Sequence, residues 1–236
     1  MRKILITNDD GIDSDGIIRL AEAAKQFGEV YVVAPDSQRS AMSHSITLRT
    51  YIDVYPYDFK VEGVHAYSCS GTPADCVRVG VLNVVPDGPD VVLSGINYGY
   101  NVASDIQYSA TAGAAFEAAF QGVQTIALSE GTTYHEVTDE YLSQILRELL
   151  DEPLGEDEIL NVNFPDCPLS DCKGILYDRQ VSKSAFYSDS YEETLLPDGG
   201  IRYNVHGSYT GYCEEDTDFR AVIEGYVSIG KVSNIN

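Results

Sequence analysis

Residues 3–10 read KILITNDD, and this stretch decides the fold. KILIT is short, apolar and β-branched, which predicts a buried strand. The chain then turns polar at once, because Asn8 is followed by two adjacent carboxylates, Asp9 and Asp10. Like charges repel, so such a pair at the end of a strand needs a structural or a chemical reason.

The residues after this strand predict a βαβ unit. Apolar side chains recur at helical spacing over residues 17–27, and Ser14 or Asp15 would cap this helix while Gly28 would end it. EVYVVAP, residues 29–35, is then a second strand. A strand–helix–strand unit of this kind implies a parallel pair of strands with helices on the faces of the sheet.

The alternation of strands and helices continues to about residue 170. The expected helix caps are Thr72, with Pro73 in the first helical position, and Thr138, and Gly122 is the expected stop of another helix. Further strands are predicted at TLRTYIDVYPY, HAYSCSG, DVVLSGIN, QTIALSE and EILNVNFP, and further helices at TPADCVRVGVLNVV, SATAGAAFEAAFQG and TDEYLSQILRELLD.

After residue 170 helical periodicity disappears and tyrosines alternate with polar residues. LLPDGGIRYNV, residues 195–205, carries a Pro-Asp-Gly-Gly turn that predicts a hairpin, and residues 219–232 are predicted to close the chain as one or two strands. A long hairpin with little core of its own is commonly buried against the parent domain or a second subunit. We therefore predict one domain over residues 1–236, with an α/β core over 1–170 and a β-rich arm and closing strands over 171–236.

Composition narrows the partners and the compartment. The formal net charge is −22, from 37 acidic and 15 basic residues, which disfavours binding to duplex nucleic acid or to an anionic membrane. Five cysteines without a CxxC spacing predict reduced thiols in a cytoplasm rather than disulfides or a zinc site. Thr7 and Asn8 interrupt the first apolar run, so we expect no signal peptide, and no stretch approaches the roughly 20 apolar residues that span a bilayer.

Polar clusters follow three of the predicted strands, at residues 8–10, 36–40 and 94–101. In open parallel sheets, ligands bind beyond the carboxyl ends of the strands, so these clusters are expected to converge. Carboxylate, hydroxyl and amide oxygens suit magnesium, manganese or calcium. The competing interpretation is a turn with a helix cap for the aspartates and loop hydrogen bonding for the others. The candidate ligands are Asp9, Asp10, Ser40 and Asn97.

Two further features border these clusters. Gly95 and Gly99 flank Asn97, and glycine permits positive φ and close approach of the backbone to a ligand, although an ordinary flexible loop has the same composition. Ser109 and Thr111 open a predicted helix, whose first N–H groups could bind an anion. Capping alone would also account for these two hydroxyls.

Together these residues resemble the SurE family, the stationary-phase survival protein E nucleotidases. The motifs NDDG, APDSQRSAMSHSITL, SGTPADCV, SGINYGYN and YSATAGAAFEAA run in family order over roughly residues 4–122, and TDFRAVIEGYVSI resembles the family's closing segment. The resemblance implies a Rossmann-like three-layer α/β core with a mostly parallel sheet. It also implies a C-terminal β-hairpin exchanged between subunits of a homodimer or homotetramer.

The resemblance further implies a divalent-metal-dependent phosphomonoesterase that hydrolyses nucleoside monophosphates, a 5′-nucleotidase. It does not decide whether the chain also has 3′-nucleotidase or exopolyphosphatase activity. It also does not decide the preferred base or the physiological metal. One Mg²⁺, Mn²⁺ or Ca²⁺ ion per subunit would be held by Asp9, Asp10, Ser40 and Asn97.

Roles in hydrolysis can be assigned on this basis. Asp9 or Asp10 would orient the attacking water or accept its proton, and Asn101 and Ser109 would bind the phosphoryl oxygens. Arg39 is a further candidate for phosphate contact, with a surface salt bridge as the alternative. His44 could protonate the leaving alcohol, but a structural role in its loop is the stronger interpretation.

The chain departs from the family pattern at three alanines. Ala110 and Ala112 replace a glycine and a valine in the helix-opening motif, and Ala103 stands where glycine is usual. Because alanine takes positive φ only at a cost, these changes put the loop geometry in question.

Other classes of protein share some of these features. A receiver-like signalling domain also has an acidic pair after its first strand and binds magnesium, but it is about half this length and would release little phosphate. A non-catalytic nucleotide- or magnesium-binding module would bind AMP equally well in the presence of EDTA. The DxDxT pattern of phosphatases with an aspartate nucleophile does not fit NDDG.

Overall fold

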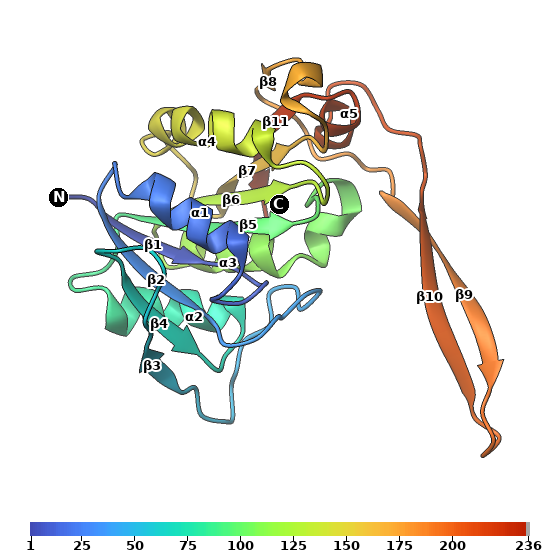
Figure 1. Cartoon of the computed structure of the whole chain (residues 1–236), viewed down its shortest axis with the longest axis horizontal. Helices are drawn as coiled ribbons and strands as arrows, with labels where there is room; N and C mark the ends of the chain where they lie inside the picture. Colours follow the sequence, from blue (N-terminus) through green and yellow to red (C-terminus); the bar gives the residue numbers. More distant parts are fainter. Residues whose placement is uncertain (235–236) are drawn as a thin grey trace.

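The computed structural model describes residues 1–234 and is built around a nine-stranded sheet (Figure 1). The strand order is β3-β4-β2-β1-β5-β6-β7-β11-β8, and the strands from β4 to β7 in this order are parallel. β3 and β11 run antiparallel to β4 and β7. The strands are β1 (Lys3–Thr7), β2 (Glu29–Pro35), β3 (Val54–Pro56), β4 (His65–Cys69), β5 (Val91–Tyr98), β6 (Gln124–Glu130), β7 (Glu158–Phe164), β8 (Ile175–Leu176) and β11 (Val227–Ser233).

Helices cover both faces of this sheet and make three layers (Figure 1). Ile4 and Ile6 of β1 pack in one buried cluster with α1 (Asp15–Ala24) and α4 (Glu136–Leu149). Leu5, which points to the opposite face, packs with α2 (Pro73–Val79) and α3 (Ala110–Phe120). Burial of each such apolar side chain stabilises the folded state by about 1.5–3 kcal/mol relative to leaving it exposed. The predicted α/β fold with a mostly parallel sheet is confirmed.

The predicted start of α2 is confirmed in detail. Thr72 Oγ1 accepts a hydrogen bond from the Asp75 N–H, and the Asp75 carboxylate accepts one from the Thr72 N–H, which makes a reciprocal capping box. The same carboxylate also accepts hydrogen bonds from the backbone N–H and the hydroxyl of Thr47. This helix end therefore also anchors the long loop that follows β2. A π-helical turn, η1 (Gly80–Val84), continues α2.

The prediction that Thr138 caps its helix is wrong. α4 begins at Glu136, and Thr138 is buried inside its first turn. The chain before the helix is held instead by the Asp166 carboxylate, which accepts hydrogen bonds from the N–H groups of Thr132, Thr133 and Tyr134. The N-cap position of α4 is His135, whose side chain makes no capping hydrogen bond, so Asp166 orders the loop before the helix and does not cap it.

The prediction that residues 219–232 form only strands is also wrong. A short helix, α5 (Asp218–Ile223), precedes β11, and the hydroxyl of Thr217 caps it by accepting a hydrogen bond from the Arg220 N–H. Phe219 and Val222 are buried at helical spacing. The side excursion after β2 also contains less strand than predicted, since β3 covers only three residues.

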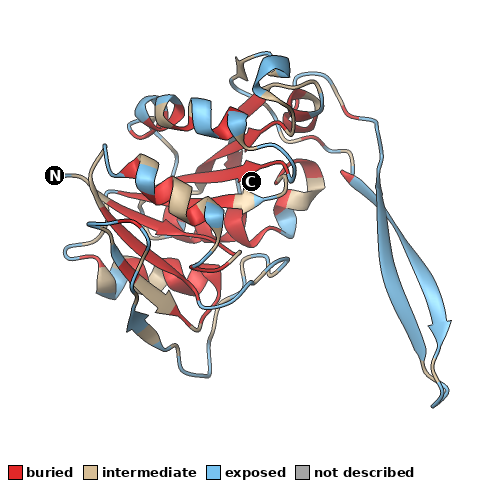
Figure 2. Cartoon of the chain, in the orientation of Figure 1, coloured by how far each residue is buried: buried red, intermediate tan, exposed pale blue. Residues whose placement is uncertain are grey.

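The predicted hairpin is present and stands away from the rest of the molecule (Figure 1). β9 (Tyr187–Leu195) and β10 (Ile201–Tyr209) pair antiparallel along their whole length. Every residue of both strands is exposed, as Figure 2 shows in pale blue. We call residues 187–209 the arm. The chain on either side of the arm returns to the main sheet through β8 and β11.

The remaining elements are two 3₁₀ turns, η2 (Ala103–Gln107) and η3 (Leu169–Asp171). No helix within the described residues is both long and apolar enough to cross a bilayer.

α3 meets the loop after β2 at Gly113, where only glycine fits. A Cβ atom at this residue would lie 2.5 Å from the carbonyl oxygen of Ser43 and 2.9 Å from Cα of His44. Both atoms belong to backbone, which cannot swing aside as a flexible side chain would.

We expect Gly113→Ala to destabilise the protein by about 2 kcal/mol, because overpacking outweighs the gain of about 1 kcal/mol in helix propensity. Chemical denaturation of the variant and the wild type measures this. Gly155→Ala is the control, since the atoms nearest its Cβ belong to the side chain of Glu158. A Gly113→Ala protein as stable as the wild type would show that the loop moves away at no cost.

Candidate active site

A cavity of about 550 Å³ lies beyond the carboxyl ends of β1 and β5. It extends from the start of α3 to the base of the arm. Five of the predicted site residues, which come from different loops, line this cavity: Asp9, Ser40, Asn97, Asn101 and Ser109.

Asp9 is the one acid among these five residues, and it is buried, with 5% of its surface exposed. Burial raises the pKa of Asp9 to about 6, and the adjacent charge of Asp10 adds to this. The hydroxyl of Thr111 donates a hydrogen bond of 2.6 Å to Asp9 Oδ1, which lowers the pKa. Within residues 1–234 no cationic side chain pairs with this carboxylate, so it lacks a counter-charge.

Asp10 is not among the described residues that line this cavity. It lines a separate cavity of about 250 Å³ with Tyr98 and Glu130, and its Oδ2 accepts a hydrogen bond of 3.1 Å from the Tyr98 N–H. Gln38 Nε2 lies 3.3 Å from Asp10 Oδ1 and donates a 3.1 Å hydrogen bond to Ser40 Oγ. The two candidate ligands Asp10 and Ser40 are therefore linked through one amide.

The loop that carries Ser40 is tied to the site by its backbone. The N–H of Arg39 donates a 2.7 Å hydrogen bond to the carbonyl of Asp9, and the N–H of Ser43 donates one of 3.0 Å to the carbonyl of Tyr108. Ala41 has a φ of +56° in this loop, a conformation that a non-glycine residue adopts at a cost of about 1–2 kcal/mol. The surrounding hydrogen bonds hold that conformation.

Asn97 is oriented by its own loop. Its Nδ2 donates a 2.8 Å hydrogen bond to the carbonyl of Gly99, which turns the amide oxygen away from Gly99. The two flanking glycines adopt the positive φ values that the sequence predicted, with φ +142° at Gly95 and φ +120° at Gly99. At Gly95 a Cβ atom would also collide with the carbonyl oxygen of Leu128.

Asn101 is held by side chains of the neighbouring strands. Its backbone N–H donates to Asn163 Oδ1 at 2.8 Å, and its carbonyl accepts from Nδ2 of Asn161 and of Asn163. Its own Nδ2 donates to Ser129 Oγ at 2.8 Å. Because main chain and side chain are both fixed, Asn101 presents a defined amide to the cavity.

Ser109 caps α3, in agreement with the simpler of the two interpretations. Its Oγ accepts a 3.0 Å hydrogen bond from the Ala112 N–H while it also lines the cavity. Ala110 is the first residue of the helix and does not have positive φ, so its replacement of glycine causes no strain.

Ala103, in contrast, has a φ of +54°. Its N–H donates a 3.1 Å hydrogen bond to Oδ2 of Asp218, whose Oδ1 accepts from the N–H groups of Ser182 and Phe219. Burial raises the pKa of Asp218 to about 6 despite these donors. One buried carboxyl group thus joins the Asn101 loop, the chain that enters the arm, and α5.

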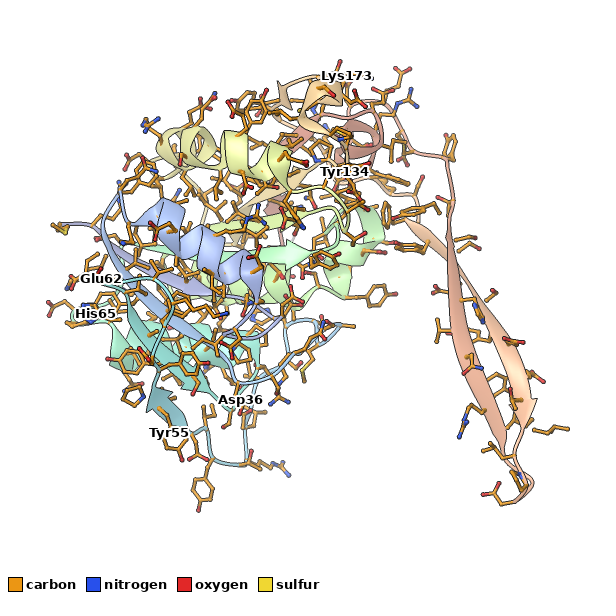
Figure 3. The ribbon with its side chains drawn as sticks, viewed as in Figure 1. Asp36, Tyr55, Glu62, His65, Tyr134 and Lys173 are labelled. Atoms are coloured by element: carbon orange, nitrogen blue, oxygen red, sulfur yellow. The ribbon has the colours of Figure 1, made fainter. Side chains whose placement is uncertain are left out.

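Arg39 and His44 are not among the described residues that line the cavity. The guanidinium of Arg39 lies 3.4 Å from Oδ1 of Asp36 and donates to the carbonyl of Ser70. Asp36, labelled in Figure 3, lies far from the arm. His44 Nε2 lies 2.8 Å from Oε2 of Glu117, a buried acid of α3. For both residues these contacts match the structural alternative, a surface salt bridge for Arg39 and a structural role for His44.

Three contributors to the site do not emerge from the sequence. The sequence suggests Thr111 only as part of an anion-binding helix start, whereas it contacts Asp9. Asn163 lies in a predicted buried strand, although an asparagine between apolar residues in NVNF is a recognisable signal. The residues at the base of the arm that line the cavity carry no such signal: Phe186, Tyr187, Asp189 and Tyr209.

The donor set fits a divalent cation of the magnesium or calcium type. Oxygens of Asp9, Ser40 and Asn97 line one cavity, with Asp10 beside them, and these are the ligand types that hard cations prefer. A buried carboxylate without a positive partner is stabilised by such an ion. No three His, Cys, Asp or Glu side chains gather as metal ligands in the described part of the chain, and the candidate ligand set contains only two carboxylates.

The mostly parallel sheet has an oxygen-lined cavity beyond the carboxyl ends of its strands. This arrangement is typical of α/β proteins that bind a ligand at the strand ends. Comparison with known proteins then identifies the family. The family model "Survival protein SurE" matches residues 4–186. This chain belongs to the SurE family, as the sequence motifs predicted.

Individual relatives agree over nearly the whole chain. A 5′-nucleotidase SurE of Flavobacterium psychrophilum is 37% identical over 231 residues, which are 96% of this chain and 89% of that protein. A 5′/3′-nucleotidase SurE of Citrobacter koseri is 40% identical over 230 residues, which are 96% and 88% of the two chains. The crystal structure of the SurE protein from Aquifex aeolicus matches with a TM-score of 0.84 at 34% identity, covering 99% of this chain and 94% of that one.

We expect Thr111→Val to reduce kcat/KM for a phosphate monoester about tenfold or more, because a hydrogen bond to a charged group is worth about 1.5–3 kcal/mol. Thr111→Ser, which keeps the hydroxyl, should retain most of the activity. Steady-state kinetics on AMP with both variants measures the difference. Equal kinetics for the valine and serine variants would remove this hydrogen bond from the site.

Proposed function

We propose that this chain is a divalent-metal-dependent phosphomonoesterase that hydrolyses nucleoside 5′-monophosphates to nucleoside and phosphate. The observation that carries the proposal is the buried Asp9 carboxylate, which lies in one cavity with oxygens of Ser40 and Asn97 in a chain of the SurE family. Both relatives described above are named nucleotidases, which supports the same activity and disfavours a receiver-like or purely binding role.

In this proposal Asp9, Asp10, Ser40 and Asn97 hold one Mg²⁺ or Mn²⁺ ion per subunit. The chemistry that such an ion supplies is neutralisation of phosphate charge and polarisation toward attack by water. Asp9, kept in place by Thr111, orients the water or accepts its proton.

The phosphate itself would be held by Asn101 and Ser109. The Asn101 amide is fixed by Asn163 and Ser129, so it donates without first having to reorganise. The first N–H groups of α3, next to Ser109, add the positive end of the helix dipole. Arg39 contributes in this proposal only if its pair with Asp36 opens.

We expect Asp9→Asn to lower the rate of phosphate release from AMP by at least about 10³-fold while leaving the fold intact, since one oxygen ligand and the proton acceptor are lost together. Phosphate release and circular dichroism measure the two effects. Asp15→Asn is the control, because Asp15 is an exposed acid of the same segment. Chelation of the wild type by EDTA should abolish activity, and added Mn²⁺ or Mg²⁺ should restore it. Near-normal activity of Asp9→Asn would refute the assignment.

We also propose that residues 1–236 form one domain and that the arm joins subunits into a homo-oligomer. β11 lies inside the main sheet, so the chain beyond residue 170 belongs to the core as well as to the arm. The arm exposes apolar side chains that an isolated subunit leaves uncovered. These are Tyr191, Leu195, Ile201, Tyr203 and Val205.

Replacing residues 190–206 by a short turn should therefore reduce the sedimentation coefficient to that of a monomer. The deletion spares the base of the arm, so the core sheet should persist, which circular dichroism checks. A truncated protein that sediments as the same oligomer as the wild type would show that the arm is not the contact between subunits.

A further inference from the structure

The cavity is larger than a phosphate group requires, and its outer part is built differently from its inner part. The inner part is formed by the loops with Asp9, Asn97 and Ser109. The outer part is formed by η2 and the base of the arm, which contribute aromatic rings and two carboxylates. The residues of this outer wall are Asp105, Tyr108, Phe186, Tyr187, Asp189 and Tyr209.

The aromatic rings of the arm base pack against one another. Phe186, with only 2% of its surface exposed, contacts Tyr187, Tyr209 and Phe219 edge to face, with ring centroids 4.7–4.9 Å apart. Tyr187 and Tyr209 are paired across the arm, with centroids 4.8 Å apart. Both tyrosines remain partly exposed at the cavity. They form an aromatic shelf that is fixed from behind by a buried ring.

An aromatic shelf of this kind binds a nucleobase by stacking. Stacking tolerates every base, because each has a π face, and it is worth roughly a factor of ten in affinity per base. This shelf and the proposed phosphate end line the same cavity, so one molecule could contact both.

The two carboxylates make the outer wall negative. Asp105 and Asp189 line the same cavity as the tyrosines, and burial, with the nearby charge of Asp189, raises the pKa of Asp105. Carboxylates accept hydrogen bonds from sugar hydroxyls and from base amino groups. They repel a second or third phosphate group, and the molecule's net charge of −22 does not offset this repulsion.

We propose that the base of the arm is a nucleoside subsite in which Tyr187 and Tyr209 stack on the base and Asp105 and Asp189 exclude polyphosphate chains. The inference rests on the proposed function of the inner site and names its substrate class. The enzyme would accept nucleoside monophosphates with little preference among bases and would be a poor exopolyphosphatase.

Stacking of the tyrosines on the base is tested with two substrates, AMP, which carries a base, and ribose 5-phosphate, which does not. Tyr187→Leu should raise KM for AMP about tenfold with little change in kcat, and should change kcat/KM for ribose 5-phosphate less than about twofold. Tyr187→Phe keeps the ring and should behave as the wild type. Tyr191→Leu, farther along the same strand and outside the cavity, is the control for any general effect on the arm. Equal losses on both substrates would overturn the subsite, and Tyr209→Leu repeats the test if the first variant does not fold.

Exclusion of polyphosphate by Asp105 and Asp189 is tested with tripolyphosphate as the substrate. The double variant Asp105→Asn, Asp189→Asn should increase kcat/KM for tripolyphosphate relative to that for AMP about tenfold, because it removes two charges that repel the chain. Glu193→Gln makes a charge change farther along β9 and should leave the ratio unchanged. An unchanged ratio in the double variant would overturn the exclusion of polyphosphate.

Failure of the proposed function gives a different result. If the wild type with Mn²⁺ hydrolyses neither AMP nor ribose 5-phosphate, the inner site is wrongly assigned. Calorimetric titration with adenosine, which has no phosphate, then still tests the subsite. Binding that Tyr187→Leu weakens about tenfold supports it, and absence of binding to the wild type refutes it.

Discussion

Burial of one carboxylate at the end of the first strand is the constraint on which the site depends. Asp9 is buried at this point, and hydrogen bonds from the hydroxyl of Thr111 and from the backbone N–H of Asp9 itself partly offset the cost of its burial. A carboxylate in such surroundings either takes up a proton or attracts a cation. The oxygen atoms of the neighbouring polar residues favour binding of a cation, and the proposed chemistry depends on that binding.

Around this carboxylate, hydrogen bonds hold the polar groups in fixed orientations. Asn163 and Ser129 fix Asn101, Gly99 fixes the amide of Asn97, and Gln38 joins Asp10 to Ser40. The contacts of Asn101 are buried, and an unsatisfied polar group there would cost about 1–3 kcal/mol. A preorganised set of donors does not have to rearrange as charge develops on a substrate.

The arm is coupled to the site through buried contacts at its base. Asp218 joins the Ala103 loop to Ser182 and α5, and Phe186 places the first and last tyrosines of the arm against the cavity. The same segment therefore extends the cavity and presents apolar side chains to the outside. In the proposed function, one structural unit would therefore contribute both to the contact between subunits and to the wall of the substrate site.

What the sequence by itself determined was local. The apolar KILIT strand, the capping box at Thr72 and Asp75, the turn of the hairpin and the positive φ of Gly95 and Gly99 all depend on neighbours within a few residues. The grouping of Asp9, Ser40 and Asn97 in one cavity was also predictable, because parallel strands end at the same edge of a sheet.

Only the tertiary structure decided the contacts between residues far apart in the chain. Asp166 binds the loop before α4, Thr111 donates a hydrogen bond to Asp9, and Tyr187 and Tyr209 line the cavity. In each case the partner lies tens of residues or more away, so no local propensity or periodicity records it. The physical reason is that a buried group is stabilised by the groups next to it in space, and these are set by the packing of the whole chain.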